Sequence, residues 1–395
     1  MSLVSQLPSK KHPNGVRLLA LDGGGVRGIA SLVMLREIMW RVRDRVNPGS
    51  EEPCLPVDFF ELAAGTSTGG IIGIMLFRLR MSADEACKQY YKIAKQVFSP
   101  KIWGWNISWL PGASYVNNGK LLFTSTRFDA EPLRKAVDSV VERFGLDDND
   151  KQKKRQAPLF HKKAGGMFLC TTAHSQAETV LMKSYQPGDS PATRSKVNDM
   201  VKAGGKGITI GMAALATSAA PTYFPEVKWE VPGQKPLTFW DGGLLNNCPI
   251  DQVWYNRFEL VGPNEDEPDV SCLISLGTGY VRPGGSWVAD YIPAVRLLET
   301  AGSVMSFATN ANAKGKDFSR HYSTLLNTRQ KYARMKYLRF NPNLRSHEIG
   351  LEDYTMMRKL EKITLEYLED HKNQSFINKA VDAICPIGAK NDCCQ

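Results

Sequence analysis

The 395-residue sequence contains no long hydrophobic run and no recognisable export signal. A helix that spans a membrane needs about 20 consecutive apolar residues, and the most apolar stretch, residues 208–224, is interrupted by Pro221. Residues 1–15 are polar, include Lys10 and Lys11, and lack the apolar centre of a secretory signal. We therefore expect a polar N-terminal segment over residues 1–15 and no transmembrane span.

Cysteine is present without organised spacing. The eight cysteines show neither the spacing of a metal site nor a disulfide framework, so no metal site is predicted. Free thiols are the usual state of cysteine in the reducing cytosol, which predicts a cytoplasmic protein. Cys393 and Cys394 lie too close to the terminus for a prenylation signal. They are read either as palmitoylation sites or as incidental residues of a disordered tail over residues 386–395.

The formal net charge is +10, and much of it is concentrated in one stretch. Residues 151–155 and 161–163 are rich in lysine and arginine and lie on either side of Pro158. A solvated loop is one interpretation. The other is attraction to anionic lipid headgroups, worth about 1 kcal/mol for each lysine or arginine near the surface. Interleaved base-stacking aromatics and a recognisable nucleic-acid module are lacking, so no nucleic-acid partner is predicted.

Strand-like and helix-like segments alternate from residue 16 to residue 280. Such alternation is typical of an α/β protein with a largely parallel sheet. After residue 290 the apolar residues recur at helical spacing, which predicts helices that pack on the same domain. The hydrophobic content of 43% is sufficient for a substantial core, and no internal repeat is visible.

The first chemically informative segment, residues 22–28, reads Asp-Gly-Gly-Gly-Val-Arg-Gly. It follows a strand-like run, residues 16–21, and precedes a helix-like run, residues 29–46. A glycine-rich turn in this position presents free N–H groups to an anion, such as the oxyanion of an acyl transfer. The glycines also satisfy the dinucleotide pattern G-x-G-x-x-G, but the next strand-like run lacks the terminal acidic residue that such a site needs. The Gly-Lys-Ser/Thr of a triphosphate loop is absent as well.

A second segment, Gly65-Thr66-Ser67-Thr68-Gly69-Gly70, reads G-x-S-x-G. The preceding residues 57–64 suit a buried strand, and the following residues 71–77 suit a packed helix. A serine at such a strand-to-helix turn exposes its hydroxyl on a sharp bend, at the positive end of a helix. Small flanking residues let the backbone bend and the substrate approach. An ordinary tight turn remains an alternative for the pattern taken alone.

A third segment, residues 239–243, reads Phe-Trp-Asp-Gly-Gly and places Asp241 at the end of an apolar strand. A carboxylate within hydrogen-bond reach of a serine hydroxyl can accept its proton. By itself the segment also reads as a common Asp-Gly turn. The order of the three segments carries more information than any one of them.

Together and in this order, the three segments resemble the patatin-like phospholipase family. The resemblance covers residues 16–285 and is supported by residues 216–224, Ala-Thr-Ser-Ala-Ala-Pro-Thr-Tyr-Phe, and residues 275–279, Ser-Leu-Gly-Thr-Gly. It implies a three-layer α/β/α fold with a largely parallel central sheet and additional C-terminal helices. The domain boundaries that follow are a catalytic domain over residues 16–290 and a helical extension over residues 291–385.

The resemblance also implies site residues. The catalytic pair carried over is Ser67, the nucleophile, and Asp241, the base. The remaining residues carried over form the oxyanion hole or support its turns: Gly23, Gly24, Gly25, Arg27, Gly28 and Thr68 for the hole, and Gly65, Gly69, Gly242 and Gly243 for the turns. Arg27 either braces the glycine loop or meets a phosphate headgroup.

The implied function is that of a lipid acyl hydrolase of the phospholipase A or lysophospholipase type. Its substrate would be a membrane phospholipid or another acyl lipid, reached by transient peripheral contact with a membrane from the cytoplasm. No cofactor and no metal ion are expected, because backbone N–H groups supply the charge stabilisation. Two alternatives stay open, an acyltransferase that uses another alcohol in place of water and a membrane-binding scaffold without catalysis.

Histidine is scarce, which bears on the choice of base. A Ser-His-Asp triad needs a histidine near the serine. His174 follows an apolar strand-like run and is the credible candidate, with His321 second. Neither is bordered by a glycine-rich turn, so direct action of Asp241 on Ser67 fits better, and His174 remains an alternative. The six histidines are His12, His161, His174, His321, His347 and His371.

Residues 98–115 contain Trp103, Trp105 and Trp109, three of the eight tryptophans. Tryptophan favours the boundary between membrane and water. The segment is predicted to form a lid or interfacial patch beside the active site. The alternative is a set of aromatic side chains that pack over the edge of the sheet.

Overall fold

The computed structural model describes residues 12–99, 101–102, 105–106, 128–174, 177–186, 207–230, 236–261, 267–280, 311–344 and 349–385. The predicted tail with Cys393 and Cys394 lies outside these ranges, and so does His347. Most of the tryptophan-rich segment lies outside them too. Two short antiparallel strands within it, β3 (Lys101–Ile102) and β4 (Trp105–Asn106), are described by their backbone alone.

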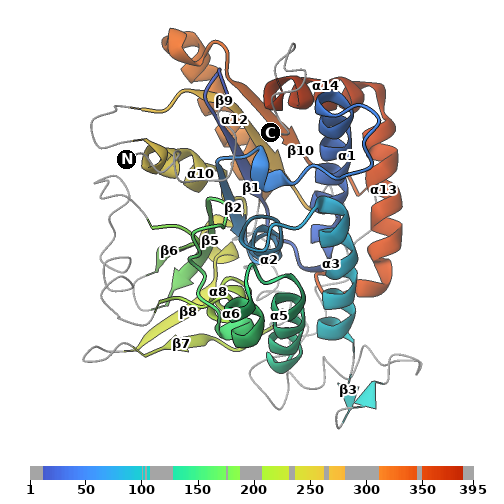
Figure 1. Ribbon diagram of the computed structural model, residues 1–395, viewed down its shortest axis with the longest axis vertical. Coiled ribbons are helices and arrows are strands. Elements are labelled where there is room, and N and C mark those ends of the chain that lie inside the picture. Colours follow the sequence, from blue (N-terminus) through green and yellow to red (C-terminus); the bar gives the residue numbers. More distant parts are fainter. Residues whose placement is uncertain are drawn as a thin grey trace, which may run out of the picture.

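Eight strands of the described chain form one mixed sheet in the order β10-β9-β1-β2-β5-β8-β7, with β6 paired to β5 (Figure 1). The strands β10, β9, β1, β2 and β5 run parallel to one another. The strands β6, β8 and β7 complete the sheet by antiparallel pairing. The prediction of an α/β fold with a largely parallel sheet is confirmed. The strands are β1 (Val16–Leu21), β2 (Leu62–Thr66), β5 (Met167–Ala173), β6 (Glu178–Lys183), β7 (Val227–Trp229), β8 (Leu237–Asp241), β9 (Val270–Leu276) and β10 (Lys336–Phe340).

The register of the parallel strands brings their carboxyl ends to one edge. Leu21, the last residue of β1, pairs with Gly65 in β2 and with Leu276 in β9. The chain that follows β1 and the chain that follows β2 therefore leave the sheet side by side. In open α/β sheets this edge is where ligands bind.

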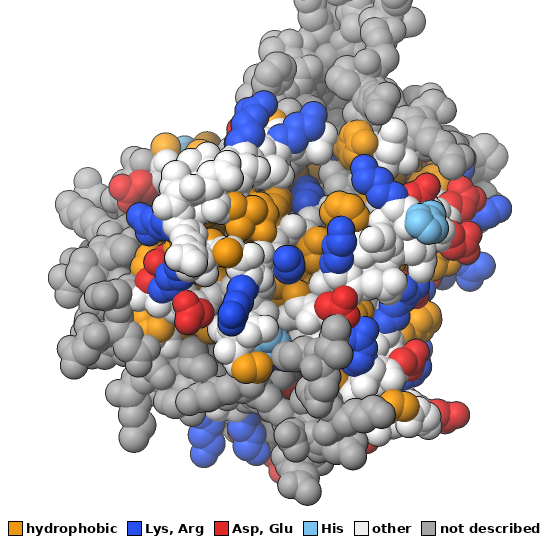
Figure 2. All heavy atoms as spheres, turned by 90° about the horizontal axis from the view of Figure 1, so that it is seen from above, with side chains coloured by type: hydrophobic (Ala, Val, Ile, Leu, Met, Phe, Trp, Pro, Cys, Tyr) orange, Lys and Arg blue, Asp and Glu red, His pale blue; other side chains and the backbone are white. Residues whose placement is uncertain are grey.

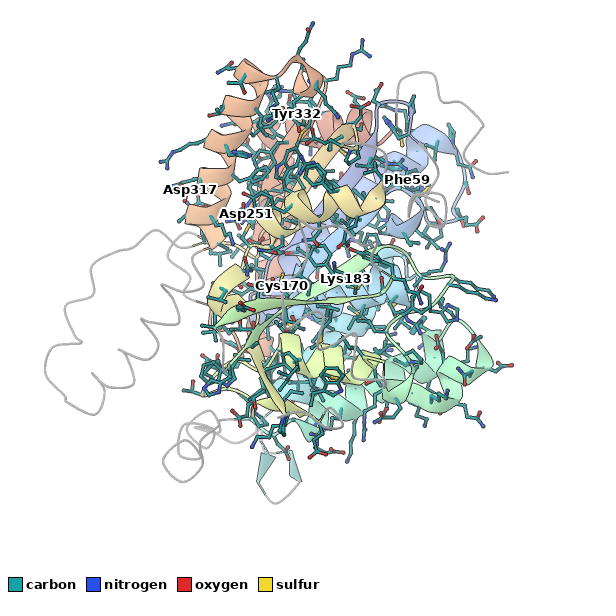
Figure 3. The ribbon with its side chains drawn as sticks, turned by 90° about the vertical axis from the view of Figure 1, so that its left-hand side faces the viewer. Phe59, Cys170, Lys183, Asp251, Asp317 and Tyr332 are labelled. Atoms are coloured by element: carbon teal, nitrogen blue, oxygen red, sulfur yellow. The ribbon has the colours of Figure 1, made fainter. Side chains whose placement is uncertain are left out.

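Helices cover both faces of the sheet, as a three-layer fold requires. In β1, Leu19 and Leu21 point into the larger core cluster, whereas Leu18 and Ala20 point into the other. The larger cluster is closed by α1, α3, α5, α8, α13 and α14, and the smaller one by α10 and α12. Figure 3 looks onto the side that α10 and α12 cover. Because both faces are buried, the central strands are apolar throughout rather than alternating.

The longer helices surround the sheet on the sides just described. The predicted helix over residues 29–46 is present as α1, and the helical pattern after residue 350 is present as α13 and α14. The helices are α1 (Gly28–Val46), α2 (Thr68–Gly73), α3 (Ala83–Phe98), α5 (Glu131–Phe144), α6 (Asp148–Lys153), α8 (Ile210–Thr217), α9 (Gly243–Asn246), α10 (Ile250–Asn256), α12 (Ala311–Thr328), α13 (Met357–Glu369) and α14 (His371–Ile384).

One strand was not foreseen. The segment over residues 291–385, for which only helices were predicted, also contains β10. This strand pairs with β9 from Lys336↔Cys272 to Phe340↔Leu276 and adds a parallel edge to the sheet. The C-terminal segment is thus built into the central layer and not only packed against it.

The basic stretch is partly neutralised. Lys154 lies 3.0 Å from a carboxylate oxygen of Glu142, and Arg155 lies 2.5 Å from one of Asp138. Lysine and arginine side chains on the face shown in Figure 2 are dispersed among hydrophobic and uncharged ones. In the described ranges, no helix has the length and the apolar composition to cross a membrane.

Candidate active site

Ser67 occupies a sharp turn between β2 and α2. Its φ of 54° is unusual for a residue with a side chain, and such a conformation costs on the order of 1–3 kcal/mol. The turn is tight, because a Cβ on Gly65 would lie 2.3 Å from the carbonyl oxygen of Gly69, and a Cβ on Gly69 would lie 2.4 Å from that of Leu21. The predicted strand–turn–helix context of G-x-S-x-G is present, with Ser67 directly before the first turn of α2.

Neighbouring segments hold the strained turn in place. The Ser67 N–H donates to Thr217 Oγ1 at 2.9 Å, and that hydroxyl donates to the Cys170 carbonyl at 2.8 Å. The Thr66 hydroxyl donates to the Asn246 carbonyl at 2.6 Å. In the sequence, the segment that contains Thr217 supports the family resemblance, but its pattern does not indicate a role for this side chain. Its role is to satisfy the backbone of Ser67 from the end of α8, which packs beside α2 on the same face of the sheet.

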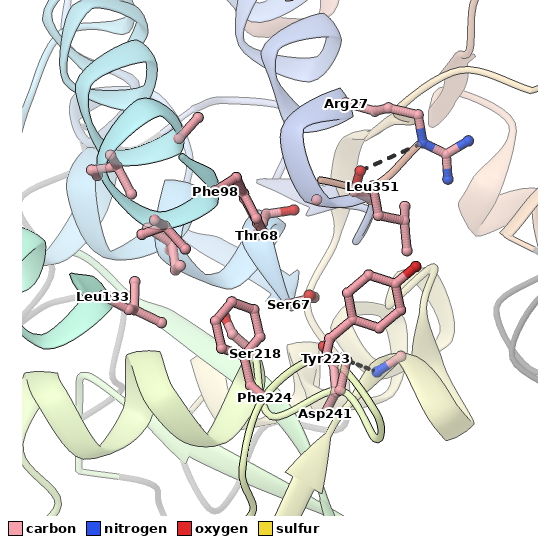
Figure 4. Close-up of a pocket in the computed structure, with 18 of the residues that line it drawn as sticks. Arg27, Ser67, Thr68, Phe98, Leu133, Ser218, Tyr223, Phe224, Asp241 and Leu351 are labelled. Carbon is pink, nitrogen blue, oxygen red and sulfur yellow. Dashed lines mark hydrogen bonds between the residues drawn. The ribbon is translucent and has the colours of Figure 1, made fainter. Parts of the chain in front are cut away.

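Asp241 ends β8 and faces Ser67 at the floor of a pocket (Figure 4). Its carboxylate accepts the Gly243 N–H at 2.6 Å. Burial raises the pKa of Asp241 to about 7, although the Gly243 N–H and the nearby Ser67 hydroxyl act in the opposite direction. Gly242 is required here, because a Cβ at this position would lie 2.1 Å from the Cys170 carbonyl oxygen.

The glycine loop after β1 lies directly against the serine. A Cβ on Gly23 would lie 3.1 Å from Ser67 Cβ. The Gly23 N–H donates to the Asn247 carbonyl at 2.9 Å, so it is not available to an oxyanion. The N–H groups of Gly24 and Gly25 have no acceptor in the described part of the chain, and both glycines line the pocket.

Thr68 and Gly28, which were also predicted for the oxyanion hole, differ in whether their N–H groups are free. Thr68 is the first residue of α2 and lines the pocket, and its N–H likewise has no acceptor among the described residues. Gly28 begins α1, and its N–H donates to the carbonyls of Gly25 and Val26. A Cβ on Gly28 would lie 2.4 Å from Tyr90 Oη, so this glycine is explained by close packing.

Arg27 lies at the edge of the pocket, with its guanidinium turned away from Ser67 (Figure 4). Its Nε donates a long hydrogen bond of 3.5 Å to the Gly24 carbonyl. Burial lowers the pKa of the guanidinium. Within the described residues it forms no ion pair. The contact with Gly24 favours a bracing role over participation in the oxyanion hole itself.

The pocket combines a polar floor with an apolar wall. It encloses about 870 Å³, including its open mouth. Its floor holds Ser67, Asp241 and the free N–H groups. Its wall comes from α2, α3 and α5 and contains Ile71, Ile93, Ala94, Val97, Phe98 and Leu133. An apolar cleft with a few convergent polar groups is the usual form of a small-molecule site.

No histidine of the described chain lines this pocket. His174 is exposed, directly follows β5, and packs its ring on Trp240 with 4.1 Å between ring centroids. His321 lies on α12 beside Phe318. Neither alternative base is therefore brought to Ser67, whereas Asp241 is.

One cluster among the described residues has ligand atoms close enough for a metal ion: Asp147, Asp150 and His161. Asp150 is already bound by both Nη atoms of the buried Arg78, at 2.7 and 2.8 Å. None of the cluster residues lines the pocket. The cluster is explained by this ion pair and adds nothing to the chemistry at Ser67.

Comparisons with known proteins agree with this geometry. The family model described as patatin-like phospholipase matches residues 19–254. The chain is 26% identical over 287 residues to patatin-like protein 4 of Arabidopsis thaliana, covering 69% of this chain and 61% of that protein. It is 31% identical over 270 residues to a cGAMP-activated phospholipase of Escherichia coli (strain TW11681), covering 67% and 62% of the two chains.

A third relative is the rat calcium-independent phospholipase A2-gamma, which is 26% identical over 265 residues. The match covers 67% of this chain but only 28% of that protein, so the chain spans less than two thirds of these curated relatives. A likeness to the solved structure of VipD from Legionella pneumophila covers 94% of this chain and 74% of that one. Its TM-score of 0.33 and identity of 13% are too low to support any argument.

Proposed function

Because the chain belongs to the patatin-like phospholipase family, a family of carboxylic ester hydrolases, we propose that it releases fatty acids from acyl lipids with Ser67 as nucleophile and Asp241 as base. The observation that carries the proposal is that Ser67 and Asp241 lie together at the floor of an apolar pocket (Figure 4). A nucleophile beside a base is the arrangement that covalent catalysis requires.

The acylation step uses three groups of this chain. Asp241 accepts the hydroxyl proton as Ser67 Oγ attacks the ester carbonyl. The N–H groups of Gly24, Gly25 and Thr68 donate to the oxyanion of the tetrahedral intermediate. Each such donor is worth roughly 2.7–4 kcal/mol in the transition state. Collapse of the intermediate forms the acyl-enzyme, and Asp241 returns the proton to the departing alcohol.

Deacylation repeats the sequence with water. Asp241 takes a proton from a water molecule, which attacks the acyl carbonyl while the same N–H groups stabilise the new oxyanion. The fatty acid leaves, and Ser67 regains its proton from Asp241. In this scheme the negative charge is always balanced by backbone donors, so the proposal contains no metal ion.

The apolar wall supports a fatty-acyl chain as the bound part of the substrate. Side chains from α2, α3 and α5 can surround a hydrocarbon chain whose ester lies at Ser67. We propose that the enzyme works at the surface of a membrane, from the cytoplasm, since such substrates reside in bilayers. The lid role of residues 98–115 belongs to the same proposal.

Fatty-acid release from mixed phospholipid vesicles, with a chelator present, tests the proposal. Wild type should release fatty acid, and Ser67→Ala should lower turnover by roughly 10⁴–10⁶-fold, as removal of a hydrolase nucleophile does. Added lysolipid distinguishes hydrolysis from acyl transfer through the products formed. Equal release by both proteins, or none by wild type on any acyl lipid, would contradict the proposal.

A further inference from the structure

Asp22, the residue that joins β1 to the glycine loop, is held by an arginine from the far end of the sequence. Arg339 on β10 donates from Nη1 to Asp22 Oδ1 at 2.8 Å and from Nη2 to Asp22 Oδ2 at 2.5 Å. The carboxylate is fully buried, and the arginine side chain is 14% exposed. Two parallel N–H···O bonds between charged groups fix orientation as well as distance.

The Arg339 guanidinium is further held by a serine hydroxyl and closely surrounded by two glycines. Its Nη1 also donates to Ser275 Oγ at 2.7 Å. A Cβ on Gly277 would lie 2.9 Å from Nη2, and one on Gly315 would lie 3.2 Å from Nε. Burial lowers the pKa of Arg339, but the Asp22 carboxylate more than offsets this, so the pKa lies above its usual value. Arg339 is therefore a permanent cation directly behind the glycine loop.

Other contacts of the loop come from the same part of the chain. Asp22 N–H donates to the Leu276 carbonyl at 3.1 Å, the Thr278 hydroxyl donates to the Gly23 carbonyl at 3.1 Å, and Val26 N–H donates to the Leu351 carbonyl at 2.8 Å. All three partners, like Arg339, lie beyond the family match, which ends at residue 254. Among these contacts the bond to Arg339 is the one between two charged side chains.

We propose that Arg339 is a positioning residue for the oxyanion hole, which acts through Asp22 to aim the N–H groups of Gly24 and Gly25 at the ester. This inference rests on the proposed function. The two glycines follow Asp22 by two and three residues, so a tilt of Asp22 displaces both donors. A catalytic group that is misplaced by about 1 Å can cost roughly 10²-fold in rate.

The buried ion pair of Arg17 with Glu61 provides a matched control. Arg17 lies near the start of β1, at the opposite end of that strand from Asp22, and it pairs with Glu61 at 2.6 Å. Both side chains are buried. Neither residue lines the pocket. A lysine in place of either arginine keeps the charge and loses the two-pronged bond, so the two variants differ chiefly in their distance from the oxyanion hole.

The test compares Arg339→Lys with Arg17→Lys on a short soluble ester. Arg339→Lys should lower kcat roughly 10²-fold with little change in KM, because the donors act on the transition state and not on the bound substrate. The inhibition constant of a trifluoromethyl ketone, whose adduct with Ser67 carries an oxyanion, should rise by a similar factor. Arg17→Lys should lower the thermal midpoint but leave kcat and ketone binding unchanged.

Equal kcat and equal ketone binding in the two variants would overturn the inference and leave Arg339 a purely structural residue. Asp22→Asn provides a second variant if Arg339→Lys does not fold, and normal kcat in it would be equally decisive. If both fold, the double variant should be no slower than the slower single one, because both changes break one bond.

The rate at which a fluorophosphonate labels Ser67 separates this inference from the proposed function. Labelling of wild type without lipid hydrolysis would contradict the proposed function alone. Under that outcome, slower labelling of Arg339→Lys than of Arg17→Lys still supports the positioning role, and equal rates overturn it.

Discussion

The protonation state of Asp241 is set by burial. The Gly243 N–H and the Ser67 hydroxyl favour the charged form of its carboxylate, and no cation of the described chain contributes to its pKa. Desolvation outweighs both, and the pKa comes to about 7. A base is most effective when its pKa lies near the working pH, so this environment suits proton exchange with Ser67 and with water.

We predict that the activity of the wild-type enzyme rises with pH through about 7. Asp241 must be deprotonated to accept the Ser67 proton, and below its pKa of about 7 most of the free enzyme carries a neutral carboxyl group. The value of kcat/KM for a soluble ester should therefore fall about tenfold for each pH unit below the pKa. A profile that is flat from pH 5 to 8, with the fold intact, would contradict Asp241 as the base.

The same pKa can be measured independently, from the free energies of unfolding of wild type and Asp241→Asn at different pH values. A carboxyl group whose pKa is raised on folding stabilises the protein below its unfolded pKa, and this contribution is lost as pH rises through the folded value. Wild type should thus lose stability relative to Asp241→Asn between about pH 4 and pH 7, by a few kcal/mol in total. Urea unfolding of both proteins at pH 4.5 and pH 8 measures the difference.

The residues that perform chemistry could be predicted from short motifs, but the residues that hold them could not. Ser67 and Asp241 each lie beside glycines in a recognisable local pattern. Thr217, which satisfies the Ser67 N–H, is 150 positions away from it, and Arg339 is 317 positions away from Asp22. Such partners carry no local signal, because their contacts exist only after the sheet has formed.

At the scale of elements, α3 is the main source of the pocket wall. Its buried face includes Tyr90, Ile93, Ala94 and Val97, all of which line the pocket. A serine N-cap begins the helix, since the Ser82 hydroxyl accepts the Glu85 N–H at 3.2 Å. The helix thus presents a fixed apolar surface toward Ser67, and its side chains set the room for an acyl chain.

We predict that Val97→Trp shortens the acyl chains that the enzyme accepts. Val97 is 5% exposed and lines the pocket, so an indole in its place occupies the space of several methylene groups. Each buried methylene contributes about 0.8 kcal/mol, so long-chain esters should lose far more in kcat/KM than short ones. A series of esters of increasing chain length measures this.

Lys95→Trp is the control for that variant, because Lys95 is exposed on the same helix. It adds the same bulk at the surface and should leave the chain-length profile unchanged. If the two tryptophan variants show the same profile, the wall formed by α3 does not contact the acyl chain.

Elements with a clear local sequence pattern were predicted well. Elements whose bounds or type depend on neighbouring segments were not. The strand over residues 16–21 and the helix that follows it are present as β1 and α1. The strand expected from residue 57 begins only at Leu62, because Pro56 starts a short 3₁₀ helix there. The strand β10 is short and lies at the sheet edge between helices, so its five residues gave too little pattern to separate it from them.

On the scale of the whole molecule, the C-terminal segment completes the fold that the family-matched residues begin. It supplies β10, the edge of the sheet beside β9. It also supplies α13 and α14, which pack on α1 and close the larger core cluster (Figure 1). Arg17 on β1 even donates to the Ile384 carbonyl at the end of α14. We therefore expect residues 291–385, predicted to pack on the same domain, to be inseparable from residues 16–290.

We predict that a chain cut after residue 290 does not fold into an active enzyme, whereas one cut after residue 385 does. The shorter chain loses the partners of many core side chains, and each fully buried Leu or Ile contributes about 1.5–3 kcal/mol. A domain is stable by only about 5–15 kcal/mol, so losing a handful of these exceeds the margin. Met357, Leu360, Ile377, Val381 and Ile384 are among those removed, all with at most 2% exposure.

Thermal unfolding followed by circular dichroism, together with labelling of Ser67, measures both chains. A cooperative transition and normal labelling in the shorter chain would show that residues 16–290 are an independent catalytic domain, and would remove the basis for a positioning role of Arg339.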